Sequence, residues 1–392
     1  MASNRPWLIV IEIIASSPTL TSINLSANRG TLPIGIWDAI MNSPKVKTLS
    51  LARINIKDVR QAKRFYKVCT LLEKLELDNC IDIYYPFFTH DMHVLPECFP
   101  SLQEIKFFNT SGYDARNYFR LLELCPELKS LYWHGDIFSL FDFCDGMVAE
   151  STFSKLDSLE VRGCSLSHLD LYEFPKKLKN PLKKLAVPRS QFDWFIIENL
   201  EERHLQSLQE LDISQCTRAT SKDFIELLRT CPALTVFKAG ILLASDINQD
   251  ETWLCAKHLT VLHIFIQVDE EDPKTSSRRV FSCLAKLTSL QELDLRASRI
   301  EVEYQTQIAS PLQLRLDHGL AQLSTLWYLK RLYFNEKEGQ DMTMEEGKWI
   351  KEHWRMLQVF QGRPSQTPRV ATQIRKLFRE ANARYHRRQP RK

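Results

Sequence analysis

Apolar residues recur along the chain in a six-residue pattern, L-x-x-L-x-L, in which isoleucine, valine, phenylalanine or tryptophan can replace leucine. From residue 20 to residue 259, six of the nine intervals between successive matches are 26 residues long. Leucine-rich hexapeptides that arise by chance have no such regular spacing, so the pattern indicates an internal repeat. The pattern begins twelve times, at Leu20, Val46, Leu72, Leu102, Leu128, Leu156, Leu182, Leu208, Leu234, Leu259, Leu290 and Leu329.

Each match predicts a short strand with its apolar side chains on one face and the intervening side chains on the other. The rest of each unit has helical spacing, as between residues 57 and 69, and Thr220 is a hydroxyl cap ahead of one amphipathic segment. A single unit cannot bury its own apolar face. We therefore expect an α/β fold, a leucine-rich-repeat solenoid that curves into a horseshoe with parallel strands on the concave face and helices on the convex face.

The repeat divides the chain into three predicted segments. Residues 1–19 match the helix of a first repeat and act as a cap, residues 20–362 form about twelve repeats, and residues 363–392 form a basic tail.

Six of the ten cysteines occupy two fixed places in the repeat. Small, weakly polar residues suit both places, and buried thiols behave as small apolar groups, so we expect scaffold roles. Cys80, Cys164 and Cys216 lie eight residues after the first repeat leucine, and Cys69, Cys125 and Cys231 lie three residues before it.

Units of the type C-P-x-L-x-x-L-x-L-x-x-C, above all residues 208–234, resemble the cysteine-containing leucine-rich repeats of F-box/LRR proteins, in the ribonuclease-inhibitor-like superfamily. The stretch 340–346, followed by Trp349, His353 and Trp354, resembles the closing unit of F-box-like LRR proteins found in fungi. The resemblance covers about residues 6–362. It implies substrate recognition in an SCF-type ubiquitin ligase, in which the repeats hold the target protein and an F-box binds a Skp-type linker and a cullin.

In that family the F-box is a helical module ahead of the repeats, longer than the 19 residues that precede Leu20 here. We therefore expect no ligase-docking module in the chain as given. Either an F-box is supplied by upstream sequence or by a second subunit, or the chain is a free-standing scaffold or inhibitor-like binder with no ligase role.

The sequence contains no motif that indicates an enzyme or a cofactor site, since GxGxxG, GxxxxGK[ST], HExxH and GxSxG are absent. His90 and His93 lie in an insertion with no cysteine nearby to complete a zinc site, and the acidic run 269–272 lacks the spacing of a calcium loop. We expect no metal at either place. The longest apolar run, residues 7–15, is shorter than the roughly 20 residues of a membrane span. We expect a cytoplasmic or nuclear protein with no membrane partner.

The net charge of +4 is unevenly distributed along the chain. Residues 363–392 contain ten Lys and Arg residues against one acid, a net charge of +9, which leaves −5 for residues 1–362. Apolar residues from Val370 to Tyr385 follow helical spacing, which favours a helix that caps the last repeat. The alternative is a nuclear-localisation or acidic-partner element at residues 387–392. The acidic body disfavours nucleic acid as a partner.

A target protein is expected on the concave face, at the polar positions that alternate with the repeat leucines. Both charges and several aromatic side chains occur there, as in protein interfaces, and Phe108, Tyr132, His134 and Phe265 are the preferred anchors. The predicted binding residues are Glu76, Asp78, Lys106, Phe108, Tyr132, His134, Glu160, Arg162, Asp212, Lys238, His263, Phe265, Asp294 and Arg296.

Overall fold

The computed structural model describes residues 5–56, 58–80, 96–110, 118, 121–135, 153–248, 251–296, 310–336 and 339–388. The insertion with His90 and His93 lies outside these residues. The chain divides into two compact units, Met1–Leu182 and Lys183–Lys392, called unit 1 and unit 2 below.

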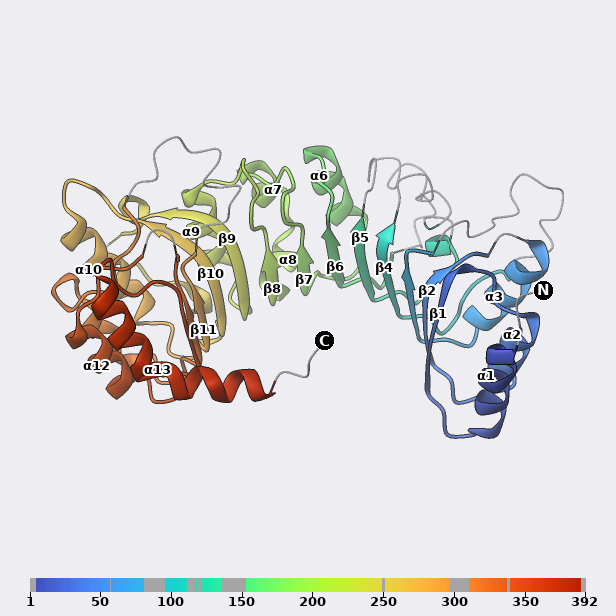
Figure 1. Ribbon diagram of the computed structural model, residues 1–392. Helices are drawn as coiled ribbons and strands as arrows, with labels where there is room; N and C mark the ends of the chain where they lie inside the picture. Colours follow the sequence, from blue (N-terminus) through green and yellow to red (C-terminus); the bar gives the residue numbers. More distant parts are fainter. Residues whose placement is uncertain are drawn as a thin grey trace. The chain divides into compact units, whose positions relative to one another are not determined.

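The described part of unit 1 contains six parallel strands that pair in the order of the sequence. Its described helices include α1 (Arg5–Ser16), α2 (Ile34–Met41), α3 (Val59–Cys69) and α6 (His168–Lys177), and Figure 1 shows α1, α2 and α3 on one side of β1 and β2. The strands are β1 (Ser22–Gly30), β2 (Thr48–Ile54), β3 (Lys74–Asp78), β4 (Glu104–Thr110), β5 (Ser130–Gly135) and β6 (Ser158–Arg162).

Unit 2 repeats the arrangement with seven described strands, again parallel and in sequence order. These are β7 (Lys184–Ala186), β8 (Glu210–Asp212), β9 (Val236–Leu243), β10 (Val261–Gln267), β11 (Glu292–Asp294), β12 (Arg331–Tyr333) and β13 (Val359–Gln361). The α-helices are α7 (Trp194–Asn199), α8 (Glu202–Ser207), α9 (Ser221–Thr230), α10 (Pro273–Leu284), α12 (Met344–His353) and α13 (Pro368–Arg388). The 3-10 helices are η4 (Ala244–Asp246), η5 (Leu254–Lys257), η6 (Leu316–His318) and η7 (Leu320–Thr325).

The strands confirm the predicted α/β repeat fold. Each of the twelve sequence matches gives one strand, β1 to β12, and equivalent positions pair across neighbouring repeats, as Leu49 pairs with Leu75. The structure adds a strand that the pattern missed, β13. Leu357 and Phe360 fit the pattern there, but Gly362 takes the third apolar position.

The repeat leucines form the core, because the helices cover one face of each sheet; Leu75 and Leu77, for example, are fully buried. Two of the cysteines bind the neighbouring repeat in the same way. The Cys80 thiol donates to the Leu51 carbonyl at 3.2 Å, and the Cys216 thiol donates to the Val187 carbonyl at 3.3 Å. Burial raises the pKa of Cys80 to about 11 and that of Cys216 to about 12, so both stay protonated at neutral pH.

Helix α9 begins where the sequence predicts, after Thr220. The backbone N–H and the hydroxyl of Thr220 both donate to the Asp223 carboxylate, at 2.7 Å and 2.9 Å. The same two hydrogen bonds occur at the start of α12, where the backbone N–H and the hydroxyl of Thr343 donate to the Glu346 carboxylate. These contacts satisfy backbone donors that a helix N-terminus leaves open.

The basic tail forms α13, which packs against α12 and β13. Ile374 and Phe378 are buried, and the Phe378 ring stacks on Phe360 with 4.2 Å between ring centroids. The helix therefore covers the last strand of unit 2. The localisation element, residues 387–392, lies beyond the side chains that the structure describes and stays a prediction. No helix in the described part of the chain is both long and apolar enough to cross a membrane.

Candidate functional site

Eight of the predicted binding residues come together on the face of the unit 1 strands opposite the described helices. The apolar residues of β3 to β6 are buried beneath the helices, while the alternating side chains stay partly exposed. Because the strands are parallel and in register, these side chains form two rows. The first row is Glu76, Lys106, Tyr132 and Glu160, and the second is Asp78, Phe108, His134 and Arg162. These eight residues are called the unit 1 strand face.

An aromatic pair lies at the middle of the unit 1 strand face. The rings of Phe108 and Tyr132 are 4.9 Å apart between centroids and tilted by 41°. Both residues are half-buried, so the pair presents apolar surface without being part of the core. Aromatic side chains with this exposure supply much of the binding energy in protein interfaces.

Ion pairs flank the aromatic pair on both sides. The Lys106 ammonium lies 3.1 Å from a Glu76 carboxylate oxygen and 2.9 Å from one of Glu104. On the other side, the Arg162 guanidinium donates to Glu160 at 2.5 Å. The hydrogen bond that Lys106 donates to Glu104 raises the pKa of Lys106. Burial opposes ionisation of Glu104, but Lys74 and Lys106 together lower the pKa of that carboxyl. Lys106 and Glu104 therefore favour their charged forms, and each ion pair holds its own side chains in place.

The second predicted group lies on the strands of unit 2. Asp212, Lys238, His263 and Asp294 occupy one row across β8 to β11, as the repeat predicts. The His263 ring lies 2.8 Å from a Glu292 oxygen, and Arg331 also binds Glu292. Burial opposes ionisation of Glu292, but His263 and Arg331 outweigh it and lower the pKa of the carboxyl.

Arg296 lies beside this row. Its guanidinium binds Asp294 and lies over the Tyr333 ring, 4.6 Å from the centroid. Asp212 and Asp294 are each only 6% exposed, so they hold neighbouring groups and offer little surface of their own. Asp212 accepts from the Ser214 hydroxyl at 2.7 Å.

One predicted anchor is wrong: Phe265 is 3% exposed and belongs to the core. His263 pairs with Lys238, but Phe265 pairs with Ile241, so β9 contains one more residue than β10 between the two pairs. The register of the two strands shifts at this point, and Ile264, Phe265 and Ile266 are all buried, so exposure does not alternate along this part of β10.

The selection of binding residues also missed Arg331 and Tyr333. Both lie on β12 in the same rows as Glu292 and Asp294. The match that begins at Leu329 places them at the same alternating positions as the selected residues, so the repeat pattern itself could have identified them.

The strand faces are suited to noncovalent recognition. Charged groups on these faces are paired, as Lys106 is with Glu76 and Arg296 with Asp294, and the half-buried aromatic rings offer contact area. Among the residues that the structure describes, no group of three or more His, Cys, Asp or Glu side chains could hold a metal ion. In comparisons with known proteins, no family model matches the chain, and no curated protein matches it significantly.

Proposed function

We propose that this chain is a protein-recognition module that binds a target through the unit 1 strand face and selects substrates for an SCF-type ubiquitin ligase. The observation that carries the binding proposal is the Phe108–Tyr132 pair, half-buried between fixed ion pairs. Protein interfaces usually have an apolar centre surrounded by a polar or charged rim.

The two parts of the face have different roles in this proposal. The aromatic pair supplies binding energy, because it loses water when a target covers it. The ion pairs of Lys106 and Arg162 select the target, because a partner must match charges that already have fixed positions. No catalytic group of this chain is required, since ubiquitin transfer is carried out by other subunits of such a ligase.

The ligase part of the proposal rests on the resemblance of the repeats to those of F-box/LRR proteins. It requires an F-box from upstream sequence or from a second subunit, through which a Skp-type linker and a cullin would join. A free-standing scaffold is the alternative, and the experiment distinguishes the two.

The test is affinity purification of the tagged full chain, expressed at its natural level. The double variant Phe108→Ala/Tyr132→Ala is purified in parallel. The matched control is Leu71→Ala/Leu169→Ala, which removes two exposed apolar side chains of unit 1 that lie outside the strand face. We expect the strand-face variant to bind the purified target about 30-fold more weakly, as loss of about 2 kcal/mol implies, and the control to bind normally.

Unchanged target binding by a folded Phe108→Ala/Tyr132→Ala variant would exclude this face. Recovery of the linker and cullin with the chain, and a target that accumulates when the chain is removed, are the results expected for a ligase receptor. Target binding without either result would make the chain a free-standing binder.

A further inference from the structure

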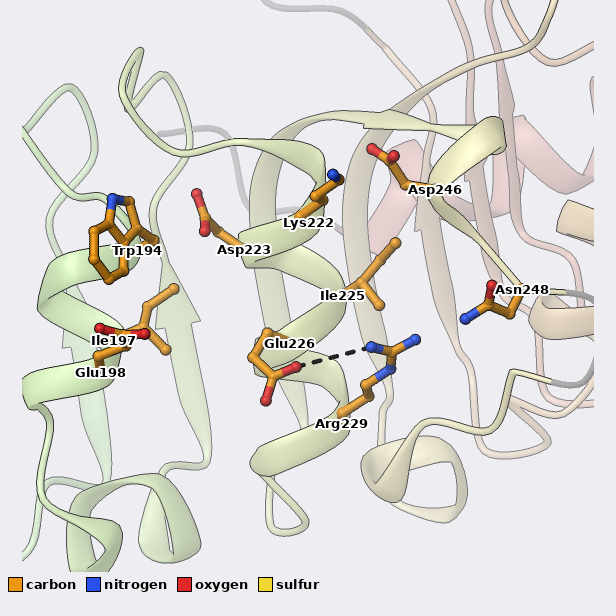
Figure 2. Close-up of a pocket in the computed structure, with 10 residues that line it drawn as sticks. All are labelled: Trp194, Ile197, Glu198, Lys222, Asp223, Ile225, Glu226, Arg229, Asp246 and Asn248. Carbon is orange, nitrogen blue, oxygen red and sulfur yellow. Dashed lines mark ion pairs between the residues drawn. The ribbon is translucent and has the colours of Figure 1, made fainter.

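Unit 2 has a groove on its helix side, away from the strand face. It measures about 400 Å³ and lies along α9, between α7 and the segment that follows η4. Figure 2 shows Trp194, Ile197 and Glu198 on one side of the groove and the side chains of α9 beside them. The groove is separate from every residue of the proposed target-binding face.

The floor of the groove is apolar and one end of it is aromatic. Ile197 and Ile225 line the groove from α7 and α9 and are themselves well packed. Trp194 is 54% exposed and contacts the Phe195 ring edge to face, with centroids 5.9 Å apart. An exposed tryptophan at the end of an apolar groove offers both contact area and a π-face for a cation.

The rim of the groove is acidic. Glu198 and Asp246 have no ion-pair partner among the described residues. Glu226 lies 3.9 Å from Arg229, marked by the dashed line in Figure 2, which is a weak contact. The remaining basic residue of the lining is Lys222, so the acids outnumber the available cations.

Arg229 contributes little positive charge to the groove, because buried Glu251 neutralises it. Its guanidinium makes two hydrogen bonds to that carboxylate, at 2.7 Å and 2.6 Å. The pair lowers the pKa of Glu251 and raises that of Arg229, so both stay charged. The groove therefore keeps a net negative charge at neutral pH.

The same chain carries a segment of complementary charge. Residues 379–392 contain six Lys or Arg residues and one acid, together with Tyr385. Among the side chains of α13 that the structure describes, Phe378 is the last buried one and Arg379 after it is exposed. The segment 379–392 has the charge, and in Tyr385 the apolar group, that the groove would accept.

We propose that the groove binds the basic segment 379–392 of a second copy of this chain. Arg side chains of that segment pair with Glu198, Glu226 and Asp246, and one of these arginines lies over the Trp194 ring. Because groove and segment are different surfaces, the contact is head-to-tail, and it links copies into rings or open chains as the concentration rises.

The test measures binding of a fluorescent peptide of residues 379–392 to the full chain by anisotropy. We expect binding that weakens as salt rises, since the contacts are between exposed charges. The variant Glu198→Gln/Glu226→Gln should bind the peptide about tenfold more weakly. Adding Trp194→Ala to this variant should weaken binding further. The control Glu270→Gln/Glu271→Gln removes the same charge from an exposed loop of unit 2 and should change binding less than twofold.

Sedimentation of the full chain supplies the second readout. We expect oligomers that grow with concentration, and loss of these oligomers in Arg384→Gln/Arg387→Gln/Arg388→Gln, which leaves the packed residues of α13 intact. Equal weakening by the loop control would mean that only the overall charge matters, and it would overturn the proposal. So would a chain that stays monomeric at every concentration.

Discussion

At the scale of single residues, backbone conformation at the ends of the strands sets the boundaries of the repeat. Three equivalent residues at the ends of strands in unit 1 adopt positive φ: Arg53 and Asn109 are the last residue but one of β2 and β4, and Asn79 directly follows β3. Asn suits this left-handed conformation because its short side chain bonds locally, and Asn109 donates to Asp78 at 2.7 Å. Gly362 follows β13 with φ +134°.

Gly362 permits the most severe single-residue test of the packing. A Cβ atom at this position would overlap the carbonyl oxygen and the ring of Phe334. We expect Gly362→Ala to lower the free energy of unfolding by about 3 kcal/mol, because steric overlap adds to an unfavourable φ. Urea unfolding measures the change.

The control for this prediction is Gly30→Ala. Its Cβ would meet only the Ala27 Cβ, at 4.0 Å, so the free energy should change by less than about 1 kcal/mol. A Gly362→Ala variant as stable as this control would show that β12 and β13 are not packed as described.

At the scale of elements, α13 is the clearest case of a helix whose role depends on one apolar stripe. Ala371, Ile374 and Phe378 are buried, whereas Arg375, Lys376 and Arg379 are exposed. Ile374 and Leu377 also approach Gly347 of α12, where a larger residue would be crowded. The helix therefore shields β13, which has no further strand beside it among the described residues.

Removal of one ring should loosen this cap. We expect Phe378→Ala to cost about 3–5 kcal/mol of stability, because Phe378 is buried against Phe360. Arg379→Ala, one residue further along, should cost less than about 0.5 kcal/mol because Arg379 is exposed. Thermal unfolding of both variants compares the two, and equal losses would contradict the packing of α13.

At the scale of the whole molecule, charge links stability to pH. Several carboxyl groups have a lowered pKa in the folded chain, including Glu104, Glu251, Glu292 and Glu346. In the unfolded chain a Glu titrates near about 4.3. Each such group therefore stabilises the fold fully above that pH, and the contribution is lost as the pH falls through the folded-state pKa.

Glu251 provides the test of this linkage, because it is buried and bonded to Arg229. At pH 7, Glu251→Gln should lower the free energy of unfolding by about 2 kcal/mol, as expected for charged hydrogen bonds. At an acid pH below the lowered pKa of Glu251, the difference from the original chain should shrink, since the acid itself is then protonated. Glu270→Gln, on an exposed loop, is the control and should have little effect at either pH. A difference that does not change with pH would contradict the lowered pKa.

The sequence alone determined the repeat, the twelve strands β1 to β12 and the faces of most strand residues. This was possible because alternation along a strand is a local property, and a nearly constant period brings equivalent positions into register. The rows that contain Lys106, Tyr132 and His263 could be predicted for that reason. Cap residues such as Thr220 could also be predicted, because their hydrogen bonds join residues only three positions apart.

Tertiary structure alone decided the features that depend on the neighbouring repeat. Phe265 is buried where the register of β9 and β10 shifts, and nothing in the hexapeptide of that repeat indicates either feature. The contact of Phe108 with Tyr132, with 4.9 Å between ring centroids, depends on the rotamers of both side chains, which are set by packing against their neighbours. The groove forms because packing brings Trp194 and Asp246, from different repeats, to one surface. The pattern within one strand specifies the face to which each side chain points. The contacts of that side chain with the next strand depend on how the repeats pack against each other.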